Sequence, residues 1–136
     1  MTHGKLAHEL LAAAQTIDGR IDGIEAVALE WTETVDGARE KIRQALDRMG
    51  QESRVIIFTD MFGGTPSNIS LSFLEKDRVE IVTGVNLPMI VKFSSLQRDS
   101  HDLAALAHTI QEKGSKSIRV ASDLLAFDPR HSGGID

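Results

Sequence analysis

Residues 54–68, RVIIFTDMFGGTPSN, contain the pattern that is most informative about the fold. Residues 54–59 form a short run rich in apolar and β-branched side chains, which is typical of a strand buried on both faces of a parallel sheet. Asp60 follows at the carboxyl end of this run. Gly63 and Gly64 then permit positive φ angles and let another group approach the backbone closely. The stretch therefore predicts a strand, a carboxylate at its end and a glycine turn in direct succession.

A helix is predicted to begin directly after this turn. Thr65 suits the N-cap, and Pro66 suits the first helical position. The free N–H groups and partial positive charge of a helix start attract anions, and the hydroxyls of Thr65 and Ser67 would add donors. An ordinary strand–turn–helix junction with a capping threonine has the same pattern, so this stretch alone leaves both interpretations open.

A second junction of the same kind lies at the start of the chain, in residues 2–7, THGKLA. Gly4 permits a tight entry into a helix, and apolar residues follow at helical spacing at Leu6, Leu10, Leu11 and Ala14. His3 precedes this turn as Asp60 precedes the other one. Two alternatives are a solvated histidine near the terminus and an adventitious copper or nickel site that includes the terminal amine.

The whole chain alternates between predicted helices and strands, which is the order of an α/β protein. The predicted helices cover about residues 5–17, 36–49, 65–75, a segment from the turn at 84–88 to about Leu96, and 101–113, the last ended by Gly114. The predicted strands cover Ile24–Glu30, 54–59, Val79–Thr83 and a segment within Ser117–Leu125. We expect a doubly wound, mostly parallel sheet in a three-layer domain over residues 1–125, followed by a mobile tail over 126–136. Parallel strands end at one edge of a sheet, so His3 and Asp60 are expected to converge there.

Composition agrees with one compact domain. The chain has 136 residues, of which 41% are hydrophobic, and this is enough for a substantial core. It has no cysteine, which excludes disulfides and thiolate metal sites and fits a cytoplasmic location. A net charge of −5 argues against nonspecific binding to nucleic acid or to an anionic membrane. No signal peptide or membrane span is predicted.

Other catalytic and metal motifs are incomplete. His8 and Glu9 begin like a zinc-protease helix, but Ala12 stands where the second ligand should be. The glycine turn lacks the Lys-Ser/Thr pair of a nucleoside-triphosphate loop. The remaining histidines have no metal-ligand spacing and are expected on exposed helix faces or in the tail: His101, His108 and His131. We therefore expect no metal and no cofactor.

Three spaced motifs in the same order resemble the mannose-type enzyme IIA of the bacterial phosphoenolpyruvate-dependent sugar phosphotransferase system. They are Thr2–Ala7, Thr59–Asn68 and Thr83–Met89, and the resemblance extends over about residues 2–125. It implies that His3 is the phosphorylated residue and that Asp60 hydrogen-bonds and orients it. It also implies that Gly63, Gly64 and Thr65 donate to the phosphoryl oxygens. Residues that would shape the site or dock partners are Phe62, which stands where some members carry tryptophan, and Ser67, Asn86 and Pro88.

The chemistry of histidine fits this role. A neutral imidazole is a nucleophile, and its phosphoramidate can pass the group onward without a nucleotide. The resemblance implies a phosphocarrier that accepts a phosphoryl group from phospho-HPr and gives it to an enzyme IIB, with the membrane involved only through a permease complex. The alternative is a regulatory module whose phosphorylation state another protein senses. The phosphoryl donor of dihydroxyacetone kinase systems is a weaker third candidate.

The resemblance also carries two expectations about the sheet. Members of the family begin with an apolar strand before the histidine, whereas only Met1 and Thr2 precede His3, so the first central strand is expected to be missing from this chain. The resemblance further implies a homodimer in which the C-terminal strand, within Ser117–Leu125, pairs with the partner's sheet. Alternation at Ile118 and Val120 is consistent with a half-buried edge strand.

Overall fold

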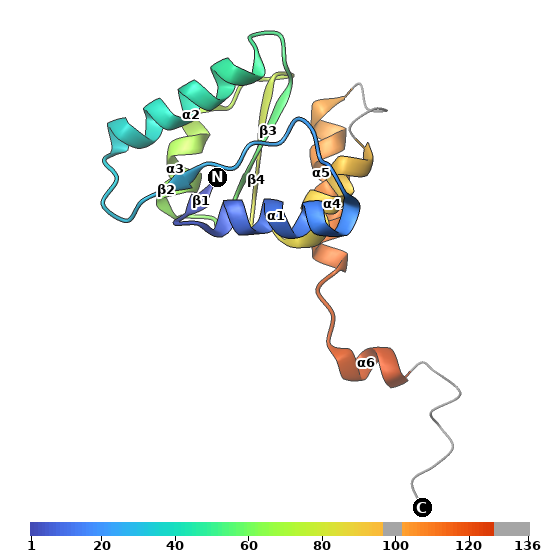
Figure 1. The fold of residues 1–136 in the computed structure, drawn as a ribbon. Coiled ribbons are helices and arrows are strands. Elements are labelled where there is room, and N and C mark those ends of the chain that lie inside the picture. Colours follow the sequence, from blue (N-terminus) through green and yellow to red (C-terminus); the bar gives the residue numbers. More distant parts are fainter. Residues whose placement is uncertain (97–101, 127–136) are drawn as a thin grey trace, which may run out of the picture.

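The computed structural model describes residues 1–96 and 102–126, and Figure 1 shows their arrangement. The strands are β1 (Thr2–His3), β2 (Ala28–Leu29), β3 (Val55–Thr59) and β4 (Val79–Thr83). The helices are α1 (Leu6–Asp18), α2 (Val35–Met49), α3 (Thr65–Ser70), a 3₁₀ turn (Leu71–Phe73), α4 (Leu87–Leu96), α5 (Leu103–Lys116) and α6 (Ala121–Ala126). The predicted alternation of helices and strands is therefore confirmed. The predicted tail beyond Ala126 and the residues His101 and His131 lie outside the described residues.

The strands form two parallel pairs. β3 and β4 pair over five residues, from Val55 opposite Val79 to Thr59 opposite Thr83. β1 and β2 pair over two residues, with His3 opposite Leu29. The Met1 ammonium donates a 2.7 Å hydrogen bond to the carbonyl of Phe58, so β1 lies beside β3. The parallel arrangement places the ends of β1 and β3 at the same edge.

Helices cover both faces of the strands and give three layers (Figure 1). On one face, α2 and α3 pack on the alternate β3 side chains Val55 and Ile57; this core also includes Leu29, Ala38, Ile42, Ile69 and Val79. On the other face, α4 and α5 pack against Ile56, Phe58 and Val82. Burial on both faces explains why β3 has no polar alternation.

Two predicted strands differ from the structure. The expected strand Ile24–Glu30 is reduced to Ala28–Leu29, because a two-residue β1 can pair with no more of it. The expected strand within Ser117–Leu125 is wrong: residues 117–120 are irregular and Ala121–Ala126 is the helix α6, which projects away from the body (Figure 1). A strand needs a neighbouring edge for its backbone groups, and this segment has none within the described chain.

Gly114 does not end its helix as predicted. It lies within α5 and is buried, and a Cβ atom there would come within 2.6 Å of Met89 on α4. Gly114 thus permits close packing of α4 and α5, and it does not end α5. The tertiary contact explains why a residue of low helix propensity stands inside α5.

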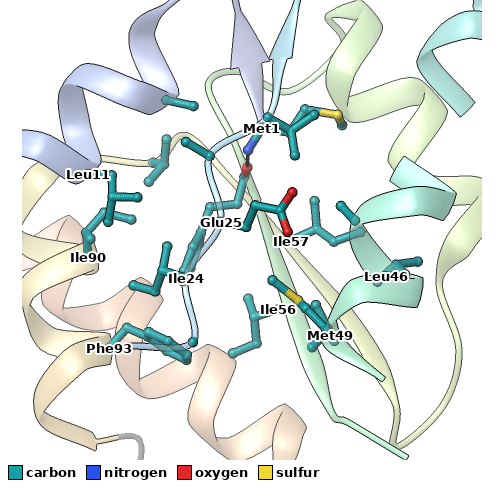
Figure 2. Close-up of a pocket in the computed structure, with 18 of the residues that line it drawn as sticks. Met1, Leu11, Ile24, Glu25, Leu46, Met49, Ile56, Ile57, Ile90 and Phe93 are labelled. Carbon is teal, nitrogen blue, oxygen red and sulfur yellow. Dashed lines mark hydrogen bonds between the residues drawn. The ribbon is translucent and has the colours of Figure 1, made fainter. Parts of the chain in front are cut away.

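A cavity of about 340 Å³ lies behind β1, between residues 23–27 and β3. Figure 2 shows that its lining is mainly apolar, with Met1 at one end and side chains from both helical layers around it. Burial lowers the pKa of the Met1 ammonium from 8.0 to about 6, although the negative charge of Asp60 opposes this shift. The cavity therefore lies beside the shorter of the two strand pairs, β1 and β2.

Candidate functional site

His3 and Asp60 meet at the carboxyl edge of the strands. One carboxylate oxygen, Oδ2 of Asp60, lies 2.7 Å from the His3 Nδ1 and accepts the His3 backbone N–H at 2.9 Å. The second oxygen, Oδ1, accepts the N–H of Met61 at 3.0 Å. An ionised carboxylate can only accept, so the imidazole proton lies on Nδ1 and the lone pair on Nε2. The predicted convergence of these two residues is confirmed.

The surroundings of Asp60 keep it ionised. Burial pushes the pKa of its carboxyl upward, but the hydrogen bonds from His3 and Met61 and the attraction of the imidazole outweigh burial. The pKa of Asp60 therefore lies below its ordinary value. A carboxylate that stays charged at neutral pH is suited to hold one tautomer of a histidine and to stabilise positive charge that develops on its ring.

The backbone around His3 fixes its position. The N–H of Gly4 donates to the Leu29 carbonyl at 2.9 Å, and Gly4 has a positive φ of 53° at the entry to α1. The buried Thr2 hydroxyl accepts the N–H of Ala7 at 2.7 Å and so serves the first turn of α1. The local THG turn thus joins β1 directly to α1 and directs His3 to the sheet edge.

The glycine turn after Asp60 packs against the His3 ring. Gly63 has φ of +82°, the left-handed region that favours glycine. A Cβ atom on Gly64 would lie 3.0 Å from Cε1 of His3 and 3.7 Å from Nε2. Only a glycine at position 64 leaves the ring this close to the backbone without displacement.

The helix start differs from prediction by one residue. α3 includes Thr65, and Gly64 rather than Thr65 occupies the N-cap. The start of α3 follows directly on the turn beside Nε2, and the N–H groups of a first helical turn have no carbonyl partners within the helix. Thr65 is exposed there, whereas Ser67 is fully buried and so is not part of a docking surface.

Trp31 is a site residue that the sequence analysis missed. Its ring stacks on the His3 imidazole with 4.8 Å between centroids and 17° between planes. Trp31 is 80% exposed and follows β2 by two residues. A signal was present, because the single tryptophan of the chain directly follows the predicted strand Ile24–Glu30 and so stands at the same edge as His3.

The remaining predicted site residues lie in two places, on the exposed turn after Asp60 and at the start of α4. Phe62 and its neighbour Met61 are exposed beside Asp60. Asn86 is engaged in the fold: its side-chain amide donates to the Gly114 carbonyl at 3.0 Å, and its Oδ1 accepts the N–H of Met89 at 3.3 Å. Pro88 stands in the first turn of α4.

Among the described residues, the other histidines and acids do not extend the site. His8 and His108 are exposed on α1 and α5. Over residues 1–96 and 102–126, no group of three histidine or acidic side chains is arranged to hold a metal ion. Within the same ranges, no helix combines the length and apolarity needed to cross a bilayer.

The geometry defines a class: a three-layer α/β protein with parallel strands and a carboxylate-oriented histidine at the carboxyl edge. Comparison with known proteins gives the family. Residues 1–111 match the family EIIA-man, described as the PTS system fructose IIA component. The chain therefore belongs to this family and is a mannose-family EIIA component of the phosphotransferase system.

Relatives in the family act with different sugars. The chain is 32% identical over 124 residues to the fructose-specific EIIA component of Bacillus subtilis (strain 168). The aligned region covers 90% of this chain and 84% of that protein. The chain is also 28% identical over 122 residues to the mannose-specific EIIAB component of Escherichia coli (strain K12). That aligned region covers 87% of this chain but only 38% of the longer protein.

Solved structures share the fold. The PTS IIA protein associated with the fucose utilization operon from Streptococcus pneumoniae matches with a TM-score of 0.77 and 28% identity, covering 91% of each chain. The mannose/sorbose specific IIA subunit from Enterococcus faecalis matches with a TM-score of 0.80 over 88% of this chain and 89% of that one. At 24% identity this second match supports the fold alone.

Proposed function

We propose that this EIIA component is a phosphocarrier that accepts a phosphoryl group on Nε2 of His3 from phospho-HPr and passes it to an enzyme IIB. The observation that carries the proposal is the 2.7 Å contact between His3 Nδ1 and Asp60 Oδ2. It keeps the proton on Nδ1 and leaves Nε2 as the nucleophile. The location of this step is the cytoplasm, where a soluble donor reaches the site.

The transfer step is a displacement at phosphorus. The Nε2 lone pair of His3 forms a bond to the phosphorus of phospho-HPr, and the bond from that phosphorus to the donor's histidine nitrogen breaks. The donor nitrogen keeps the electron pair. The proton on Nδ1 stays in its hydrogen bond to Asp60, which stabilises the positive ring of phosphohistidine. The second transfer repeats the displacement with a nucleophile of enzyme IIB, and His3 is regenerated.

Backbone N–H groups beside Nε2 stabilise the negative charge of the phosphoryl group electrostatically. We assign the N–H groups of the Gly63–Thr65 turn and of the start of α3 as donors to the three equatorial oxygens of the phosphoryl group during transfer. The support is the close approach of Gly64 to the His3 ring and the exposure of Thr65. Positioning and charge stabilisation are the main contributions that a protein makes to phosphoryl transfer.

Partner docking is assigned to the exposed side chains around this edge. Met61 and Phe62 are 55% and 74% exposed beside Asp60, and exposed apolar groups of this size commonly mark interaction sites. Pro88 and Asn86 shape the neighbouring turn rather than the phosphoryl site.

The test uses phosphoenolpyruvate with enzyme I and HPr. The wild type should take an acid-labile, alkali-stable label and release it to enzyme IIB. His3→Ala should take none. Because the His3 side chain is only 20% exposed and contacts Asp60, the melting temperature of the variant is measured alongside to establish that it is folded. Equal labelling of His3→Ala and wild type would overturn the proposal. Labelling of His3 without onward transfer to any enzyme IIB would instead identify a regulatory module.

Two further features of the molecule complete the proposal. We propose that an extended apolar segment fills the cavity between residues 23–27 and β3, in line with β1.

We also propose a homodimer that covers the apolar side chains of the C-terminal arm, residues 117–126. The support is the 55–76% exposure of its large apolar side chains, Ile118, Val120, Leu124 and Leu125. Truncation after Lys116 should convert a dimer in sedimentation experiments to a monomer; a wild-type monomer would contradict the dimer.

A further inference from the structure

Trp31 covers one face of the reactive histidine although most of its own surface is in solvent. The rings of Trp31 and His3 are nearly parallel at 17°, with centroids 4.8 Å apart. The side chain is 80% exposed, so core packing does not account for its position. Its ring contact is with the residue that we assign to the reaction.

The turn that carries Trp31 is tied down on both sides. The N–H of Glu33 donates to the Glu30 carbonyl at 3.0 Å, which closes the turn around Trp31. Lys41 of α2 bonds to the Glu33 carboxylate at 2.5 Å and to the Ala28 carbonyl at 3.1 Å. The indole is therefore presented from a connection that is anchored to both β2 and α2.

Three contacts then define the orientation of the imidazole. Asp60 bonds to Nδ1, the backbone of Gly64 stands against Cε1, and Trp31 covers a face. A hydrogen bond to Nδ1 fixes a point on the ring but lets the ring tilt about the bond axis. A stacked aromatic ring resists this tilt because tilting separates the two faces.

We infer that Trp31 is a positioning residue for phosphoryl transfer: it fixes the plane of the His3 imidazole so that the Nε2 lone pair points toward the incoming phosphorus. The inference rests on the proposed function of His3. Reactivity in a displacement depends steeply on alignment of the attacking atom, so a loosened ring reacts more slowly even after the donor is bound.

The experiment compares wild type with Trp31→Ala and Trp31→Phe. Leu74→Ala is the matched control, since Leu74 is an exposed apolar residue that precedes β4, at the end of the strand away from the site. At saturating phospho-HPr, the single-turnover rate should fall about three- to tenfold in Trp31→Ala, and Trp31→Phe should recover most of it. Leu74→Ala should react at the wild-type rate.

A second measurement reports the stack itself. In NMR spectra the His3 ring protons should be shifted upfield by the indole ring current in wild type and in Leu74→Ala. The shift should be lost in Trp31→Ala and largely retained in Trp31→Phe. Because Trp31 is the sole tryptophan, its fluorescence should also change when wild type is phosphorylated but stay constant in His3→Ala.

The outcomes separate this inference from the proposed function. A wild type that takes label on His3 while Trp31→Ala shows an unchanged rate at saturation overturns the positioning role alone. A raised KM with unchanged rate at saturation does the same and makes Trp31 a docking contact. An absent ring-current shift in wild type overturns the stack in solution. A wild type that takes no label on His3 overturns the proposed function and, with it, this role.

Discussion

The two strand pairs of this protein differ in completeness, although each supplies one half of the site. β3 and β4 pair over five residues and lead to Asp60, whereas β1 and β2 pair over two and include His3. The cavity lies behind the short pair, and the His3–Asp60 contact lies in front of it. The site therefore depends on the carboxyl edge of the strands, where both pairs are present, and not on how many residues pair behind that edge.

The largest expected effect comes from breaking the contact that joins the two pairs at the site. Asp60→Asn should slow phosphorylation of His3 by about 10²-fold or more, because a neutral amide no longer favours the Nδ1–H tautomer or the positive ring. Single-turnover labelling at saturating phospho-HPr measures the rate. Asp47→Asn, the same chemical change on the exposed side of α2, should leave it unchanged. A wild-type rate in Asp60→Asn at equal thermal stability would remove Asp60 from the mechanism.

A smaller effect should follow from completing the short pair. An apolar strand of about five residues fused ahead of Met1 would lie between residues 23–27 and β3 and fill the cavity. We expect the melting temperature to rise by about 5–15 °C, since filling a cavity of this size restores apolar contacts and satisfies strand-edge backbone groups. An extension of equal length made of glycine and serine is the control. Equal melting temperatures for the two extensions would contradict the vacant-strand interpretation.

The smallest expected effect comes from the Met1 amine, which lies at the end of the β1–β2 pair. The folded-state pKa of the Met1 ammonium is about 6 against 8.0 for an unperturbed terminus. Between these values the unfolded chain binds a proton that the folded chain does not, so stability rises with pH. The free energy of unfolding should increase by about 1–3 kcal/mol from pH 6 to pH 8.

Urea denaturation of the chain that begins at Met1, at several pH values, measures this change. The loss of folding stability caused by the buried Met1 amine is fully present below pH 6 and absent above pH 8. Either N-terminal extension converts the amine into an amide and should abolish the Met1 contribution to the slope. The same pH dependence in the extended chains would assign the slope to other groups.

Much of the fold followed from local patterns. The β-branched run at 54–59 and the apolar stripe of 36–49 correspond to β3 and α2 within one residue at each end. The two glycine turns correctly placed His3 and Asp60 at strand ends, because a positive φ angle and a following helix are properties of the local chain. The convergence of the two residues required one further step, the rule that parallel strands end at a common edge.

The errors concern elements whose state depends on distant partners. Residues 118–120 have strand-like alternation but no strand edge to pair with in the described chain, and the next residues form α6. Gly114 suits a helix end by propensity, yet α5 continues through it because Met89 occupies the space beside it. Ser67 has the right chemistry for an anion site but is buried inside the protein.

Local sequence patterns were enough to predict the alternation of helices and strands, the two strand-to-helix turns and the pairing of His3 with Asp60. These features depend on short-range backbone preferences and one general topological rule. Three features became visible only in the folded molecule: Trp31 stacks on His3, Gly64 lies against the ring, and a cavity lies behind β1. These features depend on distances between side chains and backbone far apart in the chain, which no local pattern specifies.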